Sequence, residues 1–579
     1  MKKLVSICVV AVASLAIVAC GKKDKPVAMA DASGSALLAY VPADTPYVFA
    51  ALEPMSQGFV DKMAPINNQL GEIMSGVMAS AEAGAEGDDD GAAVLNFMSA
   101  MFELIKPETM AEFGFSQRTT SAIYGNGLLP VIRITLDETG KFNGRFKQLA
   151  EEQGWAVSEA AAGGINYQRV TFDAPVGIIA AEADGMAVVT VAPAEFGEGE
   201  IATLLGAEKP ANSLEASGGI KALAAKYGMI PQGLGYLDMQ RLAGVMIDGP
   251  SNSLDSKLFE MAGQSPGDML TDVCKAEIKG LVAGAMSRIA FGYKSASTDS
   301  MDLLAVVEMR EDLATSLVPI ASAVPGLTAD STALMKFGIG LNLQGLRDFV
   351  SNKMGEMVEN PYECAELSGL NDMAIQLTGA MQQPVPPIVY NFKGAFFELD
   401  NLDGIDLGSP SVPESLDANV VLAFDNVEGL IAMGQMMLPP LGMMELAADG
   451  EPVQIPQEML TGYGGATFAA MTENLLAIST GNGAESNAKS LAGVSDPGEP
   501  VLMATSVDLA AYMSLIGDIQ KGAMAGIEDI DSEGAEAIKA MNDAQQKMTE
   551  AYAEIFDRET VLLKPTNNGI EIPMNITFK

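Results

Sequence analysis

The chain has 579 residues, with 75 acidic against 34 basic side chains, a formal charge of -41 at pH 7 and no histidine. This charge argues against a nucleic-acid partner held through its phosphates and against adhesion to an anionic membrane surface. The absence of histidine excludes Ser-His-Asp and Cys-His nucleophiles, HExxH zinc sites and haem with a histidine ligand.

Residues 1–20 have the pattern of a secretion signal. Lys2 and Lys3 form a basic start, and the apolar run Leu4–Ile17 is too short to span a bilayer. The closing residues Ile17-Val18-Ala19-Cys20 resemble the lipobox of bacterial lipoproteins. The resemblance implies cleavage after residue 19 and acylation of Cys20, for example with palmitate. An ordinary secretory signal with an incidental cysteine is the alternative.

Residues 20–36 are rich in small and polar residues and are expected to form a flexible tether. Residue Gly21 follows the cysteine. In the lipoproteins that this region resembles, an aspartate there would imply retention in the inner membrane. The resemblance therefore implies a lipid anchor in the outer membrane, facing the periplasm, in a Gram-negative host.

The segment Val41–Phe49 (VPADTPYVF) leads into the first predicted strand. Pro42 and Pro46 favour an extended approach to the strand that begins at Tyr47. Together with the lipobox, this segment resembles the start of a group of bacterial envelope lipoproteins of unknown function. The resemblance implies an envelope protein and assigns no functional residues.

Similar patterns recur at an offset of 289 residues, which suggests an internal repeat. Tyr47–Glu53 resembles Lys336–Asn342, and both predict a strand that enters a helix. Ala180–Thr190 resembles Ala469–Ser479, and both predict a strand, a tight turn and a second strand. Two unrelated stretches with similar strands are the alternative.

Further hairpins are predicted in both parts of the chain, at Thr120–Leu136, Pro387–Leu402, Arg288–Met309 and Thr560–Phe578. Because 48% of the residues are hydrophobic, the chain can bury large cores. We therefore expect an α+β protein with two similar tandem halves, residues 37–312 and 328–579, each with antiparallel strands packed against helices.

Cys274 and Cys364 are the cysteines that remain once Cys8 leaves with the signal and Cys20 carries lipid. An even pair in an oxidising compartment predicts one disulfide. Two separately buried thiols are the alternative. No C-x-x-C sequence occurs, which disfavours a catalytic dithiol.

The chain has 36 methionines, and a cluster of them surrounds Pro439-Pro440. The cluster consists of Met433, Met436, Met437, Met443 and Met444. Thioethers bind Cu(I), but the spread of methionine through most predicted helices favours adaptable apolar packing. A methionine-lined groove for a lipid or an apolar partner segment is the functional interpretation of the same pattern.

Two short sequences match catalytic patterns, and neither has the required context. Gly263–Gly267 matches G-x-S-x-G, which needs a histidine, and Ser486–Lys489 matches S-x-x-K without its companion sequences. No metal or cofactor is predicted. The expected function is a lipid-anchored, non-enzymatic binding or structural role, for an apolar ligand or a protein partner. The alternative is a hydrolase that uses carboxylates alone, such as a glycosidase.

Overall fold

The computed structural model describes residues 36–66, 107–116, 118–171, 176–263, 266–403, 415–437, 444–456, 460, 465–524, 546–547 and 549–579. The predicted signal and Cys20 lie outside these residues. The chain divides into two compact units. Unit 1 comprises residues 1–305 and 532–551, and unit 2 comprises residues 306–531 and 552–579.

The expected fold of two similar tandem halves is wrong. In the part of the chain that the structure describes, the strands belong to one open 19-stranded sheet. The expectation gave each half its own set of antiparallel strands. Alternation of apolar and polar residues determines which side chains share a face, whereas the free N–H and C=O groups of an edge strand accept any further strand.

Unit 1 is built around β1 (Tyr47–Ala51), which pairs antiparallel with β2 (Ser121–Asn126) and with β8 (Leu234–Asp238). Beyond β2, the order of strands is β3 (Leu129–Thr135), β7 (Met186–Pro193), β6 (Val176–Ala183), β5 (Ile165–Thr171) and β4 (Ala156–Ala162). Beyond β8 come β9 (Arg288–Ala296) and β10 (Ser300–Glu308), whose last residues belong to unit 2.

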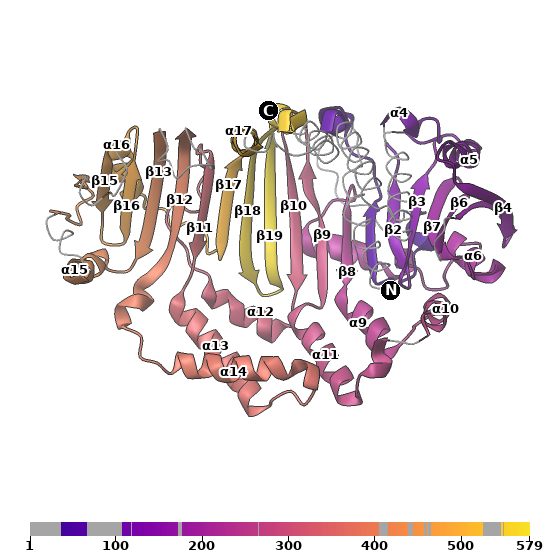
Figure 1. Cartoon of the computed structure of the whole chain (residues 1–579), viewed down its shortest axis with the longest axis horizontal. Coiled ribbons are helices and arrows are strands. Elements are labelled where there is room, and N and C mark those ends of the chain that lie inside the picture. The colour runs from indigo at the N-terminus through magenta and orange to yellow at the C-terminus, as the bar shows by residue number, and fades with distance from the viewer. Residues whose placement is uncertain are drawn as a thin grey trace. The chain divides into compact units, whose positions relative to one another are not determined.

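Unit 2 is built around β11 (Met335–Gly340), which pairs antiparallel with β12 (Phe392–Asp403) and with β17 (Met503–Asp508). The remaining order is β13 (Ser415–Phe424), β16 (Leu475–Thr480), β15 (Thr467–Met471) and β14 (Val453–Gln454) beyond β12, and β18 (Phe556–Thr566) and β19 (Gly569–Phe578) beyond β17. Figure 1 shows β11, β12 and β13 side by side. The pairing around β11 therefore follows the same order as the pairing around β1.

Turn residues explain which predicted hairpins form. Asp184 and Gly185 both have positive φ, 51° and 73°, and connect β6 to β7 as a two-residue turn requires. The hairpin predicted within Pro387–Leu402 is wrong. That range holds the 3-10 helix η6 (Pro387–Asn391) and most of β12, and the partner strand β13 begins only at Ser415.

The sheet of unit 1 is covered on one face by α5 (Phe142–Glu152), whose apolar residues recur every three or four positions. Ile123, Ile132 and Val189 point from β2, β3 and β7 into the resulting core. Four phenylalanines complete it: Phe113, Phe115, Phe142 and Phe146. Their rings lie 5.8–6.2 Å apart between centroids, so this face is closed by aromatic packing.

The other helices of unit 1 follow β7 and β8. They are α6 (Glu198–Leu205), α7 (Leu214–Ser217), α8 (Gly219–Tyr227), α9 (Met239–Asp248), α10 (Ser253–Ala262), the 3-10 helix η3 (Pro266–Met269) and α11 (Asp272–Ala285), while η2 (Leu38–Tyr40) and α4 (Pro107–Met110) precede β2. Side-chain caps begin several of them, as at Asp238, whose carboxylate accepts from the N–H of Arg241 3.0 Å away.

The helices of unit 2 are α12 (Glu311–Leu317), η4 (Val318–Ile320), α13 (Leu343–Glu359), η5 (Ala365–Leu367), α14 (Ser368–Met381), α15 (Val427–Met437), α16 (Ala484–Ala492) and α17 (Leu509–Met524). Ala488 and Ala492 of α16 pack on Val421, Phe396 and Ala504 of the sheet. This contact covers the face of β11–β13 that carries Phe396. In Figure 1, α13 and α14 lie beyond the lower ends of the strands.

Candidate functional site

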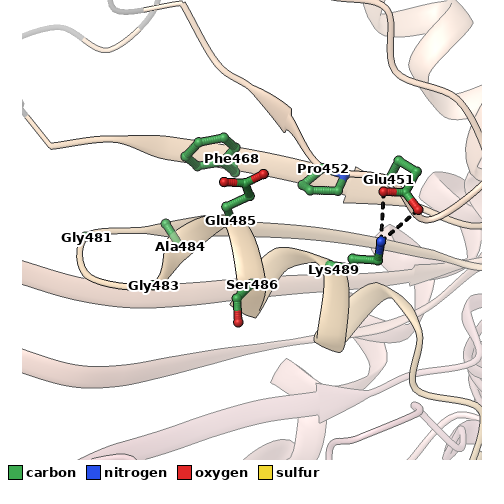
Figure 2. Close-up of a pocket in the computed structure, with 9 residues that line it drawn as sticks. All are labelled: Glu451, Pro452, Phe468, Gly481, Gly483, Ala484, Glu485, Ser486 and Lys489. Atoms are coloured by element: carbon green, nitrogen blue, oxygen red, sulfur yellow. Dashed lines mark hydrogen bonds and ion pairs between the residues drawn. The ribbon is translucent and has the colours of Figure 1, made fainter.

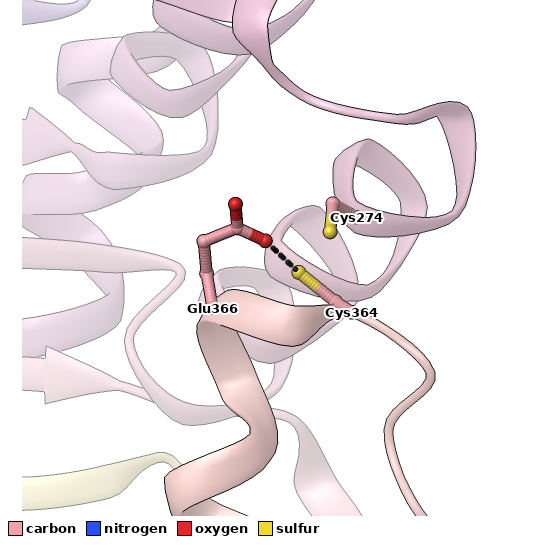
Figure 3. Close-up of side chains that lie close together, drawn as sticks. All are labelled: Cys274, Cys364 and Glu366. Atoms are coloured by element: carbon pink, nitrogen blue, oxygen red, sulfur yellow. Dashed lines mark hydrogen bonds between the residues drawn. The ribbon is translucent and has the colours of Figure 1, made fainter.

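Both predicted disulfide cysteines are buried and disulfide-bonded. Cys274 is 3% exposed in α11 of unit 1, and Cys364 is 2% exposed before η5 of unit 2. Figure 3 shows the side chain of Glu366 next to Cys364, with 3.1 Å between Oε2 and Sγ. Because a disulfide sulfur carries no thiolate, these cysteines are not available as metal ligands. That they bond to each other stays a prediction, which peptide mapping under non-reducing conditions checks.

The methionines of the predicted groove differ in their exposure to solvent. Met436 on α15 is 80% exposed, Met433 is half-buried, and Met444 is buried in an apolar cluster with Phe424 and Val427. Met443 and the side chain of Met437 lie outside what the structure describes. The groove therefore stays a prediction. Met444, for its part, packs in an apolar core, which was the alternative interpretation of the methionines.

A row of exposed apolar side chains lies on the face of the unit 2 sheet that α16 does not cover. Phe337 is 45% exposed, and its opposite residue Phe397 on β12 is half-buried. Val420 on β13 lies opposite Phe397 and is 36% exposed, while Ile339, two residues beyond Phe337, is 37% exposed. Residues directly opposite on antiparallel strands share a face, so these side chains form one surface.

The row continues across β17 and β18. Thr505 lies opposite Phe337 and Val561 opposite Thr505, and Met503 lies opposite Ile339. We call this surface the apolar face and define it by Phe337, Ile339, Phe397, Val420, Met503, Thr505 and Val561. None of these side chains is charged, in a chain with a net charge of -41.

A buried cation lies on the opposite, covered face of the same strand. Lys336 is 3% exposed and donates to the carbonyl oxygens of Gly326 and Ala329, at 2.5 and 3.3 Å. Its Nζ lies 3.3 Å from Oε1 of Glu398, which also accepts from Ser331 at 3.1 Å. Burial lowers the pKa of Lys336, and the charge of Glu398 opposes this shift. The arrangement anchors the segment before β11 to the sheet.

Polar residues continue from Lys336 in register across the sheet. Glu398, Asn419 and Ser479 lie opposite one another on β12, β13 and β16. Asn419 donates to Asp400 at 2.9 Å, and burial raises the pKa of Asp400 despite this bond. The Oδ1 of Asn419 and the Oγ of Ser479 are buried without a partner among the described residues, which costs stability.

Unit 1 holds a second buried cation that the sequence analysis missed. Arg133 on β3 is fully buried, donates to Tyr124 at 3.0 Å and to the carbonyl of Leu205 at 2.6 Å, and stacks 4.0 Å from the ring centre of Tyr40. Burial, then the 2.5 Å bond that the Tyr40 hydroxyl donates to Asp184, raises the pKa of Tyr40 to about 12. The sequence offers one signal for this buried cation, which is an arginine inside the apolar run Leu129–Thr135.

Of the two short catalytic matches, only Ser486–Lys489 can be placed. Residues 264 and 265 of the G-x-S-x-G match lie outside what the structure describes. Ser486 and Lys489 line a cavity of about 510 Å³ beside α16, together with Glu451, Phe468 and Glu485. Figure 2 shows Lys489 directed at Glu451, with Nζ 2.7 and 2.8 Å from its two oxygens. The contact that the structure gives Lys489 is thus an ion pair with Glu451.

No protein-family model, curated protein or solved structure matches the chain. Among the described residues, no helix combines the length and the apolar character that crossing a bilayer requires.

Proposed function

We propose that the protein is a lipid-anchored binding protein of the bacterial cell envelope, without catalytic activity, and that its apolar face docks an apolar segment of a partner protein. The observation that carries the proposal is the exposure of Phe337, Ile339 and Val420 on neighbouring strands. Contiguous exposed apolar side chains mark interaction surfaces in soluble proteins.

A protein partner fits the apolar face better than a small apolar ligand. Sites for small molecules are concave and enclose the ligand, whereas the row from Val420 to Val561 crosses five neighbouring strands of a sheet. A charged partner segment would lose its hydration there without gaining an ion pair. An apolar segment, which loses no such hydration, is therefore the expected occupant.

The lipid anchor is supported by the sequence of residues 1–20 alone. Mass spectrometry of the mature N-terminal peptide is expected to give a diacyl or triacyl modification on Cys20. The Cys20→Ser variant is expected to leave the membrane fraction. An unmodified N-terminal peptide in the membrane fraction would contradict this part of the proposal.

Docking at the apolar face is tested by photo-crosslinking in the native envelope. A benzoylphenylalanine at Thr505 is expected to capture one protein of defined mass. The double variant Phe337→Ser/Val420→Ser is expected to lower this adduct about tenfold or more. Ile375→Ser removes another exposed apolar side chain of unit 2, on α14, and serves as the matched control, with an unchanged adduct.

A second position controls for general proximity. The same crosslinker at Ser490, exposed on α16, is expected not to capture that protein. Docking at the apolar face is rejected if Thr505 captures nothing, or if the adduct survives the double variant at its original level. Circular dichroism of the variants separates loss of docking from loss of the fold.

A further inference from the structure

The cavity beside α16 in unit 2 has two chemically different ends. At one end, Lys489 and Glu451 form an ion pair, so their charges largely cancel. At the other end, Figure 2 shows the carboxylate of Glu485 beside the ring of Phe468. No hydrogen-bond or ion-pair partner of Glu485 is found among the described residues.

An aromatic face next to an unpaired carboxylate attracts a cation through two additive effects. The ring quadrupole of Phe468 attracts positive charge that lies over the ring. The carboxylate of Glu485 adds charge attraction, which the net charge of -41 reinforces. The amides at the start of α16 carry about half a positive charge, which is less than the full charge of Glu485.

The cavity also limits the kind of cation. It is a pocket open to solvent with a volume of about 510 Å³, which is room for a small organic molecule, and Pro452 and Ala484 add apolar lining. A strongly hydrated metal ion prefers several oxygen ligands, and among the described residues that line the cavity only Glu485 offers an unpaired carboxylate. The geometry points to a binding site for a small organic ammonium group with an apolar surface, placed against Phe468 and Glu485.

Choline and its neutral isostere 3,3-dimethylbutan-1-ol test this site by ligand-observed NMR titration of the full chain. Choline is expected to bind at least about tenfold more tightly than the neutral alcohol. Glu485→Gln and Phe468→Leu are each expected to weaken choline binding about three- to tenfold. Glu473→Gln, at an exposed turn of the same unit, is the matched control and is expected to change nothing.

Lys489→Gln gives the sharpest test because it removes a positive charge and frees Glu451. This variant is expected to strengthen choline binding severalfold, whereas a cavity for anions would not take up choline at all. Equal binding of choline and the alcohol, or an equal loss in the Glu473→Gln control, would overturn the proposal as non-specific adsorption. Unchanged thermal midpoints establish that Glu485→Gln and Lys489→Gln remain folded. These two variants test the site even if Phe468→Leu destabilises the apolar core beneath α16.

Discussion

Two corresponding faces of the sheet, one in each unit, are covered to different extents. In unit 1, the face formed by β2, β3 and β7 is closed by Phe113, Phe115, Phe142 and Phe146, each at most 4% exposed. In unit 2, β13 has the place of β3 in the pairing order and exposes Val420 at 36%, while β11 has the place of β1 and exposes Phe337 at 45%. Apolar strand residues thus have two uses in one sheet, as core beneath a helix and as exposed surface.

The apolar character of a strand residue does not by itself decide how much that residue stabilises the fold. A buried phenylalanine stabilises the fold through lost water contact and close packing, whereas an exposed one contributes little until a partner covers it. Substitutions on the two faces should therefore differ in stability and in binding.

Phe142→Ala in unit 1 is expected to lower the unfolding free energy by about 3–5 kcal/mol, because it leaves a cavity among four rings. Phe337→Ala in unit 2 is expected to change it by about 0.5 kcal/mol or less, as for other surface positions. Chemical denaturation followed by circular dichroism measures both. Equal losses in the two variants would show that the face of Phe337 is covered in solution.

Lys336→Met tests the covered face of unit 2, one residue away from Phe337. The change leaves Glu398 buried without its cation and frees two carbonyls, so a loss of about 3 kcal/mol is expected. Adding Glu398→Leu should restore part of this loss, because no unpaired charge then remains. If Lys336→Met is as mild as Phe337→Ala, the two faces of β11 do not differ as the structure shows.

Asp255 in unit 1 gives a pH-dependent effect. Its carboxylate is buried, accepts from the N–H of Leu128 at 2.8 Å, and leaves Oδ2 without a partner among the described residues. Burial raises its pKa in the folded state above the ordinary value near 3.8. The folded state therefore binds the proton more tightly, and stability falls as pH rises from about 3.8 through the raised value.

Asp255→Asn removes this titration. Relative to the wild type, the variant is expected to gain stability as the pH rises through that window and to keep the gain at neutral pH. Denaturation midpoints at pH 3.5 and 7 measure the difference, with exposed Asp272→Asn as the control. A wild-type advantage that grows with pH would contradict the raised pKa.

Phe337→Ser is expected to have the smallest effect on stability but to lower the binding of an apolar dye to the surface. Fluorescence of an apolar dye should fall in this variant, because the apolar face loses its most exposed ring. Phe146→Leu, a conservative change in the closed core of unit 1, should leave the dye signal unchanged. A dye signal that does not respond to Phe337→Ser would place the apolar surface elsewhere.

Much of the local structure is predictable from the sequence. The turn at Asp184-Gly185, the strand at Tyr47 and the hairpin at Thr120–Leu136 all form as their residue patterns predict. These features depend on neighbours in the chain, such as the positive φ that the turn needs. The hairpin at Pro387–Leu402 fails because a long connection separates β12 from β13, and strand periodicity carries no information about loop length.

Most residues of the candidate site could not be predicted from the sequence. Met433 and Met436 attract attention as a cluster, yet the exposed face is built from Phe337, Val420 and their neighbours on distant strands. Arg133 and Lys336 interrupt apolar strands, which is a visible signal of a special position. Their partners come from residues far along the chain or in loops, so their roles cannot be predicted from spacing.

Local residue patterns were enough to locate most of the predicted strands and tight turns and to say which side chains of a strand share a face. That the strands form one sheet, and that α5 covers the face of β2, β3 and β7 while the face of Phe337 stays exposed, depends instead on the tertiary fold. Local patterns depend on φ/ψ preferences and on a two-residue period. The choice of pairing partner and of cover depends on contacts between residues hundreds of positions apart, which no short window contains.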